Sequence, residues 1–285
     1  MTRSRFAMVA AFLAWAGLAH AADRLLIFSK TLGFRHDDGI VAGIAAIKSL
    51  GVAQGFVVDA SENSTAFTDA NLAQYKAVVF LSPSGEILDA DQKAAFKKFI
   101  RNGNGFVGLH NSTAFVLEGW GWYDSLICAR YDSEIHSPSF RLQVVDKSHI
   151  STVGLPATWN FADEDAYNFK SNPKALGATV LINLDETGLD EGAMGKDHPY
   201  SWYHRYDGGR AWYTIGGSSA GGYSDSLFLK HLAGGIKYAM GNGDAGIRGA
   251  VSGSGEAPTM AFERQPAWRG GDGKTYSVVG RRAVD

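Results

Sequence analysis

The sequence predicts an α/β fold in which a mostly parallel sheet is covered by helices on both faces. Four short and almost continuously apolar segments are typical of buried strands, at 24–28, 55–58, 77–81 and 105–109. Two segments with apolar residues at helical spacing lie between them, at 38–50 and 89–102. Because buried strands that alternate with helices are typical of a doubly covered parallel sheet, these observations set the fold class.

Beyond the fourth strand the pattern is less regular. Three more strands are predicted at 141–146, 180–184 and 210–215, and a helix at 225–240 closes the domain. From residue 242 onward apolar residues no longer recur at regular spacing, so we expect 242–285 to be a tail, extended or partly disordered. The sequence therefore predicts one globular domain over 22–241.

The amino terminus has the pattern of a secretory signal peptide. Arg3 and Arg5 precede an apolar run, and Ala19 and Ala21 form a small-x-small cleavage motif. The alternative is an uncleaved membrane anchor, but the apolar run is shorter than the roughly 20 residues of a spanning helix. We expect residues 1–21 to be removed and the mature protein to be periplasmic or secreted, without membrane association.

The composition restricts the classes of partner. The 285 residues carry 27 Lys and Arg against 29 Asp and Glu, for a formal net charge of −2. Without a basic excess to neutralise phosphates, nucleic acid is not an expected partner.

The single cysteine, Cys128, cannot form an internal disulfide, and its apolar neighbours predict a buried thiol. The 7 Trp and 11 Tyr suit sugar stacking or an aromatic core, and composition does not separate the two.

A polar loop between the first strand and the first helix is the first candidate site. It contains Arg35, His36 and Asp37. Active sites of parallel α/β folds gather at the carboxyl ends of strands, and a helix amino terminus favours anions. One interpretation is that His36 faces the active cleft and Arg35 binds a carboxylate or phosphate. The alternative is that Asp37 or Asp38 caps the helix and His36 lies on the surface.

The turn after the strand at 105–109 is the second candidate. His110 stands where a strand-to-helix turn presents a side chain at the top of the sheet. Histidine at such a place suits proton transfer or metal ligation. Ser112 is a weaker candidate for a nucleophile, because nothing in the sequence orients a base toward it. The alternative for His110 is a buried structural histidine.

Further polar candidates come from the less regular half of the chain. They are His136, the acidic run 163–165, and His198 beside Trp202. Clustered carboxylates could supply a general acid or base, or could bind a metal together with the histidines. The alternative is a solvated acidic turn.

Taken together, these motifs resemble the ThuA-like, or trehalose-utilisation, family. The resemblance spans about residues 24–241 and rests on motifs that occur in one order: Gly33-Phe-Arg-His-Asp37, Gly108-Leu-His110, Trp122-Tyr123, His136-Ser-Pro138, Leu155-Pro156, Asp163-Glu164 with Tyr167-Asn-Phe169, Asp197-His-Pro199 with Trp202, Tyr206 to Tyr213, Tyr223-Ser-Asp225 and Phe228 to His231. It implies a class I glutamine-amidotransferase-like fold, which is a flavodoxin-like three-layer sandwich, and a link to carbohydrate metabolism.

The resemblance also sets expectations for the chemistry. His110 stands at the position of the amidotransferase cysteine, so glutamine hydrolysis through a thiolate is not expected. Relatives commonly have Gly-His where this chain has Gly216-Gly217. We expect an exported enzyme that cleaves or processes a glycoside, including an oxidised 3-keto sugar, in the manner of a glycoside hydrolase or lyase. The alternatives are a non-catalytic sugar-binding protein on the same fold, which Gly217 favours, and a periplasmic scaffold protein.

Residue roles follow from this expectation. His110 and Glu164 are the candidates for acid–base catalysis, and His36 and Asp37 are the candidates for polarising the substrate or helping to bind a metal. The candidate substrate-binding residues, several of them aromatic faces for a sugar ring, are Arg35, Trp122, Tyr123, His136, Asp163, His198, Trp202 and Tyr203.

A metal ion is the one cofactor that the sequence suggests. His36, His110, His136 and Glu164 offer three imidazoles and a carboxylate, which is a plausible zinc set with room for water or a sugar hydroxyl. The metal-free alternative uses His110 and Glu164 as a proton-transfer pair, because no short-range histidine pair brings two ligands together.

Overall fold

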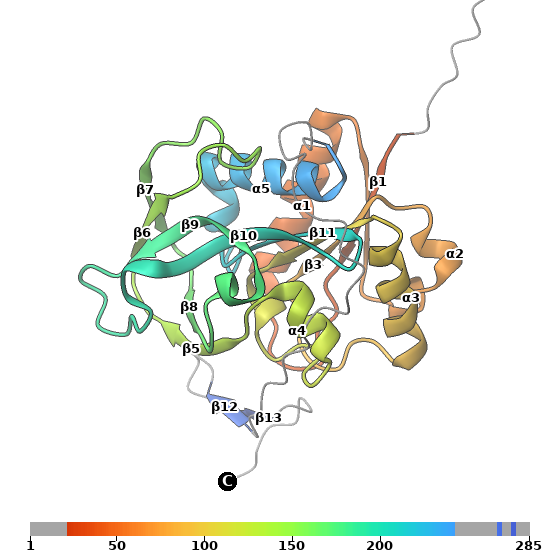
Figure 1. The fold of residues 1–285 in the computed structure, drawn as a ribbon, viewed down its shortest axis with the longest axis horizontal. Coiled ribbons are helices and arrows are strands. Elements are labelled where there is room, and N and C mark those ends of the chain that lie inside the picture. The colour runs from red at the N-terminus through yellow and green to blue at the C-terminus, as the bar shows by residue number, and fades with distance from the viewer. Residues whose placement is uncertain (1–21, 243–266, 270–274, 278–285) are drawn as a thin grey trace, which may run out of the picture.

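The computed structural model describes residues 22–242, 267–269 and 275–277 (Figure 1). The expected signal peptide and most of the expected tail lie outside the described residues. In the described part of the tail, β12 (Ala267–Arg269) and β13 (Thr275–Ser277) pair antiparallel. Among the described residues no helix has the length and apolar character needed to cross a membrane.

The described part of the chain is built on a nine-stranded mixed sheet, and the predicted α/β fold class is confirmed. Its order is β2-β1-β3-β4-β11-β10-β9-β6-β7. The five strands from β2 to β11 are parallel, and those from β11 to β7 pair antiparallel. The strands are β1 (Arg24–Phe28), β2 (Val57–Ser61), β3 (Ala77–Leu81), β4 (Gly105–Leu109), β6 (Ser139–Val144), β7 (Thr158–Ala162), β9 (Thr179–Asp185), β10 (His198–Tyr206) and β11 (Gly209–Thr214).

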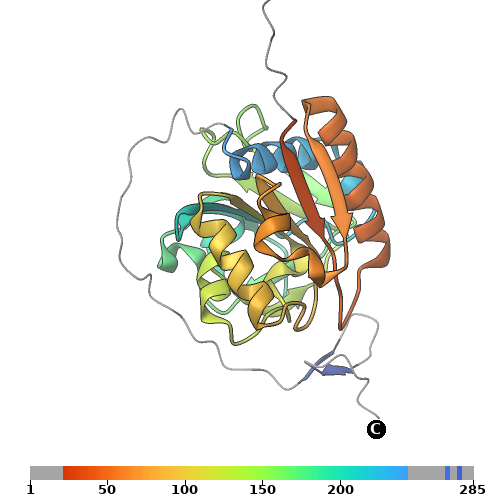
Figure 2. The ribbon, with the colours of Figure 1, turned by 90° about the vertical axis from the view of Figure 1, so that its right-hand side faces the viewer.

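Helices cover both faces of this sheet, which makes three layers (Figures 1 and 2). On one face lie α1 (Asp37–Gln54) and α5 (Ser226–Ala239), and on the other lie α2 (Asp69–Leu72), α3 (Ala90–Arg101) and α4 (Gly121–Ile127). The predicted boundaries of α3 are confirmed by its caps, since the Asp89 carboxylate accepts the amide of Gln92. The second predicted strand begins later than expected, because Gly55 ends α1 with a φ of +80°.

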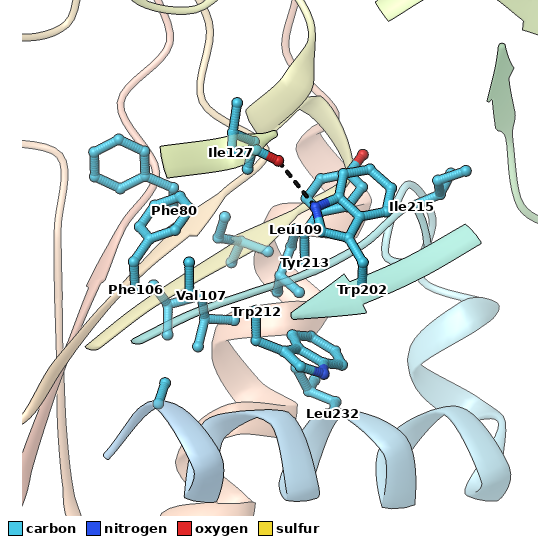
Figure 3. Packing of buried hydrophobic residues seen from close by; sticks show 14 of the residues in the cluster. Phe80, Phe106, Val107, Leu109, Ile127, Trp202, Trp212, Tyr213, Ile215 and Leu232 are labelled. Carbon is cyan, nitrogen blue, oxygen red and sulfur yellow. Dashed lines mark hydrogen bonds between the residues drawn. The ribbon is translucent and has the colours of Figure 1, made fainter. Parts of the chain in front are cut away.

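The core is aromatic on both sides of the sheet (Figure 3). Trp212 and Tyr213 are neighbours on β11 and therefore point to opposite faces. Trp212 packs against α5, where a Cβ at Gly235 would lie 2.4 Å from its ring. The ring of Tyr213 packs at a tilt against that of Trp202, with centroids 4.3 Å apart, and Nε1 of Trp202 donates to the carbonyl of Ile127 at 2.9 Å.

A small second sheet reaches over the carboxyl ends of the central strands. It pairs β5 (Tyr131–Ile135) antiparallel with β8 (Ala166–Phe169) and sets Glu134 opposite Tyr167. The described chain also has the short 3-10 helices η1 (Ser64–Ala66), η2 (His110–Thr113), η3 (Pro173–Leu176), η4 (Gly195–Asp197) and η5 (Gly222–Ser224). The pairing of β5 with β8 brings the second half of the chain to the loops that follow β1 and β4.

Candidate functional site

Two histidines from separate loops meet where the parallel strands end. His36 immediately precedes α1 in the loop after β1, and His110 directly follows β4. Their Nε2 atoms lie 3.1 Å apart, with the rings edge to face at 4.4 Å. Both lie at the carboxyl ends of parallel strands, where such folds place their ligands. The interpretation of His36 as a surface residue is not supported, because its ring packs on His110 and on Phe34.

His110 is held in a single orientation and tautomer. Its backbone is left-handed, with a φ of +47°, which is uncommon for a residue with a side chain. Its Nδ1 lies 2.9 Å from the carbonyl oxygen of Ile215, and because a carbonyl only accepts, Nδ1 carries the proton. The lone pair of Nε2 therefore faces His36. Burial lowers the pKa of His110 to about 3, so the imidazole is neutral near pH 7.

Tyr167 completes the buried part of the site. Its hydroxyl lies 2.5 Å from Nε2 of His110 and donates to that lone pair. A second acceptor, Oδ1 of Asn111, lies 3.5 Å from the same hydroxyl. Burial raises the pKa of Tyr167 well above its ordinary value, which keeps the phenol protonated. The sequence pattern includes this tyrosine as part of a family motif but does not assign it to the site.

Asp165 supplies a carboxylate at the edge of the cluster. Its Oδ2 lies 3.9 Å from Nε2 of His110, and its side chain is 37% exposed. The amide of Asp165 donates to Oγ of Ser218, which ties this loop to the segment after β11. One ligand atom each from His36, His110 and Asp165 lie within 4.8 Å of one another. We call these three residues the His-His-Asp cluster.

The pKa values of His36, within the cluster, and of Glu134, beside it, are both shifted. Burial, together with the His110 imidazole, lowers the pKa of His36 to about 3. Burial and the Asp165 carboxylate raise the pKa of Glu134. Glu134 pairs with Tyr167 across the small sheet, so this carboxyl group stands beside the phenol. Sequence analysis missed Glu134, because only the pairing of β5 with β8 brings it here.

Glu164 has a role different from the one expected. Its buried carboxylate accepts the amides of Gly217 and Ser218 at 2.8 Å each and that of Ser219 at 3.4 Å. Burial raises the pKa of Glu164 to about 7, and these amide donors oppose that rise. Its hydrogen bonds within the described chain go to residues 217–219, so Glu164 shapes the loop after β11.

This loop also explains the departure at Gly217. The φ of Gly217 is +105°, and a Cβ there would lie 2.5 Å from the hydroxyl of Tyr223. A histidine side chain does not fit this backbone without a rearrangement. The glycine instead brings its amide close to Glu164.

Arg35 and Asp37 bind each other beside the cluster. The Nε of Arg35 donates to Asp37 at 2.7 Å, and its Nη2 donates to Glu62 at 2.8 Å. The expected anion-binding guanidinium is therefore already paired with carboxylates of the chain itself. The Asp37 side chain is mostly exposed. The alternative interpretation, in which Asp37 or Asp38 caps α1, is not supported either, because no side-chain hydrogen bond caps this helix.

Three other expected site residues lie outside the cluster. His136 is exposed and pairs with Glu191, at 3.1 Å from Nδ1 to the carboxylate. His198 is fully buried between Glu186 and the backbone carbonyl of Tyr167, at 2.7 and 2.8 Å. Asp163 is exposed, and its carbonyl accepts the hydroxyl of Ser219. The structure does not place His136 or Glu164 with the other two candidate metal ligands.

The expected sugar platform is wrong for three aromatic residues. Trp202 and Tyr123 are 1% and 0% exposed, and Trp122 is 7% exposed with its Nε1 bound to Asp207. Side chains so buried cannot offer a ring face to a sugar. Tyr203 is partly buried and stacks on His149 with ring centroids 4.2 Å apart. The aromatic composition thus serves the core.

The predicted burial of Cys128 is confirmed, and its thiol contacts the buried His204. Burial raises the pKa of this thiol, so it is not a thiolate nucleophile near pH 7.

Comparison with known proteins agrees with this fold. A family model described as "ThuA: Trehalose utilisation" matches residues 24–239. A ThuA-like protein from Bacteroides uniformis superimposes with a TM-score of 0.67 at 19% identity, covering 79% of this chain and 95% of that one. A ThuA-like protein from Parabacteroides merdae gives a TM-score of 0.63 at 17% identity, with coverages of 78% and 92%.

A cytoplasmic protein from Salmonella typhimurium gives a TM-score of 0.53 at 10% identity, with coverages of 75% and 98%. At these identities the similarities concern the fold. No curated protein sequence matches the chain significantly. Since the family model covers nearly all of the domain, the chain belongs to the ThuA, or trehalose-utilisation, family.

Proposed function

We propose that this protein is an exported enzyme that processes a glycoside by proton transfer at the His-His-Asp cluster. The observation that carries the proposal is the buried hydrogen bond between Tyr167 and the free lone pair of His110. The family's description, trehalose utilisation, supports a carbohydrate as the substrate class.

The geometry supports a relay in which His36, which reaches solvent, exchanges a proton with the substrate and His110 stores it. When His36 removes a proton from the sugar, its own Nε2 proton passes to Nε2 of His110 while the buried Tyr167 hydroxyl turns to Asn111, and the return of that proton serves the departing oxygen. Nδ1 stays bound to Ile215 throughout. The carboxylate of Asp165, 3.9 Å from Nε2, stabilises the transient imidazolium.

An oxidised sugar suits such a weak base best. A ketone at C3 of a glucoside acidifies the C–H bond at C2, and loss of that proton lets the C1–O bond break. His36 and Asp165 are the members of the cluster that reach solvent, so they are the groups placed to meet the ring. The relay assigns proton transfer to His36 and His110, and it assigns Glu164 to the loop that supports Asp165.

A substrate screen tests this proposal. The mature protein is incubated with trehalose, other disaccharides and their 3-keto counterparts, and products are identified by mass spectrometry. Cleavage or isomerisation of at least one compound supports the proposal. Recovery of every compound unchanged would contradict it.

Gly217 favours a second candidate, a sugar-binding protein without turnover. The backbone at residue 217 has no room for the histidine that relatives commonly carry. Saturable changes in tryptophan fluorescence with a sugar that is recovered intact would support this candidate over the enzyme.

A further inference from the structure

We infer that His36, His110 and Asp165 bind one divalent transition-metal ion. The ligand atoms come from the loops after β1, β4 and β7, and they converge within 4.8 Å. Two imidazoles and one carboxylate with open positions are a ligand set that Zn²⁺ and Fe²⁺ accept. The inference deepens the proposed function and rests on it only for the ion's role, because binding is measured without a sugar.

The distance between the two imidazoles fits one shared ion. Two nitrogens at about 2.0–2.1 Å from a tetrahedral ion lie roughly 3.3 Å apart, and the Nε2 atoms of His36 and His110 lie 3.1 Å apart. The Asp165 oxygen is 3.9 Å from His110 and stands on a side chain with freedom to rotate, since more than a third of it is exposed. A small rotation completes the set.

The count of protons around Nε2 of His110 is the second observation. Because Nδ1 holds its proton against Ile215, Nε2 has one lone pair. Both the hydroxyl of Tyr167 and Nε2 of His36 lie within hydrogen-bond distance of that lone pair. Only one donor can use this lone pair. If the Tyr167 hydroxyl donates to it, no hydrogen bond accounts for the 3.1 Å distance between the Nε2 atoms of His36 and His110. A cation between the two nitrogens explains the approach directly.

The outer contacts are also those of a metal-binding histidine. A ligating imidazole donates its second N–H to a carbonyl or carboxylate, which sets the tautomer and the ring direction. The carbonyl of Ile215 does this for His110. The hydroxyl of Tyr167 has Oδ1 of Asn111 as its alternative acceptor when the lone pair of His110 is in a coordination bond.

The roles in the proposed function change in one respect. With the ion bound, His36, His110 and Asp165 are all ligands, and Tyr167 and Glu134 are the groups left to move protons. His110 is required in either state. Binding of the ion and turnover of a sugar can therefore fail independently.

The test is a titration of tag-free mature protein, stripped with EDTA, with Zn²⁺ by calorimetry and with Co²⁺ by visible absorption. We expect one equivalent of each ion and a d–d spectrum typical of four or five ligands. H36Q and D165N should each weaken metal binding by about 100-fold or more. Loss of a hydrogen bond to a ligand weakens metal affinity by only about 10- to 100-fold, so loss of a ligand should cost at least as much. Both replaced residues lie in loops, so their melting temperatures should stay close to that of the wild type.

Two controls distinguish this site from other histidines. H136A removes an exposed histidine that pairs with Glu191 outside the cluster, and it should leave the affinity unchanged. Y167F should retain or tighten binding, because the hydroxyl competes for the lone pair of His110. Absence of stoichiometric binding by the wild type, equal affinity in D165N, or loss of binding in Y167F or H136A would overturn the assignment.

Discussion

The hydroxyl of Tyr167 lies 2.5 Å from Nε2 of His110, although the two residues are 57 positions apart in the chain. The contact forms because β8, which carries Tyr167, pairs with β5 above the end of β4. This contact therefore depends on the small sheet as much as on the parallel strands.

Glu164 should stabilise the fold rather than act on the substrate. E164A removes the acceptor of the buried amides of Gly217 and Ser218, and an unsatisfied buried amide costs about 1–3 kcal/mol. We expect a loss of about 3 kcal/mol in the free energy of unfolding, measured by urea denaturation, and a smaller loss for E164Q. The control is D163N at the exposed neighbour, which should change stability by less than about 0.5 kcal/mol. An E164A protein as stable as D163N would show that the loop does not need the carboxylate.

Gly217 should resist any side chain. In G217A the new Cβ meets the Tyr223 hydroxyl at 2.5 Å on a backbone with a φ of +105°. G55A is the matched control, because Gly55 also has a positive φ and nothing within 4 Å of a Cβ. Backbone strain costs both variants about 1–3 kcal/mol, and the clash should cost G217A roughly 1–3 kcal/mol more. Equal chemical denaturation midpoints for the two variants would argue against the clash.

Acid should destabilise the protein partly through His231. Burial lowers the pKa of this histidine to about 3, from an ordinary value of 6.5, and both ring nitrogens are hydrogen-bonded. Below pH 6.5 the unfolded chain takes up a proton that the folded chain refuses, so stability is full above pH 6.5 and falls as the pH drops toward 3. The expected slope for one such group is about 1.4 kcal/mol per pH unit.

The variant H231Q tests this slope. Unfolding free energies of wild type and H231Q are measured by denaturation between pH 7 and pH 4. H231Q should be less stable at pH 7, and its stability should fall less steeply with acid by about one proton. If the unfolding free energies of the two proteins fall with the same slope as the pH drops, the pKa of His231 is not lowered in the folded state.

Export should remove the first 21 residues. The charged start, the apolar run and the motif that ends at Ala21 are typical of a cleaved signal peptide. Amino-terminal sequencing of the protein recovered from outside the cytoplasm should begin at or near Ala22. A mature protein that begins at Met1 would contradict the prediction.

The fold could be predicted where burial leaves a local mark. Strands β1, β3 and β4 are nearly continuous apolar runs, because helices cover both of their faces. Strand β10 is not predicted from the sequence, because its histidine, arginine and tyrosine residues do not form an apolar pattern although most of the strand is buried. Strands β5 and β8 are short, and β5 is mostly polar, so their pairing leaves no periodic signal.

The site could be predicted only in its first half. His36 and His110 were found because each follows a recognisable strand. The sequence offers Asp165 only as one member of the acidic run 163–165 and Tyr167 only as part of a family motif, because their approach to His110 depends on how the antiparallel half folds back. Trp202 was misassigned, since an aromatic residue beside a histidine has the same sequence pattern in a core as on a surface.

The role of His110 is tested most directly by the activities of wild type, H110N and H136A on one sugar from the screen. Asparagine tolerates the left-handed backbone of residue 110, so the variant should keep the fold, which circular dichroism checks. We expect H110N to lose about 100-fold or more in kcat/KM, because acid–base groups contribute on that scale, while H136A keeps full activity. Full activity in folded H110N would contradict the assignment of the site to His110.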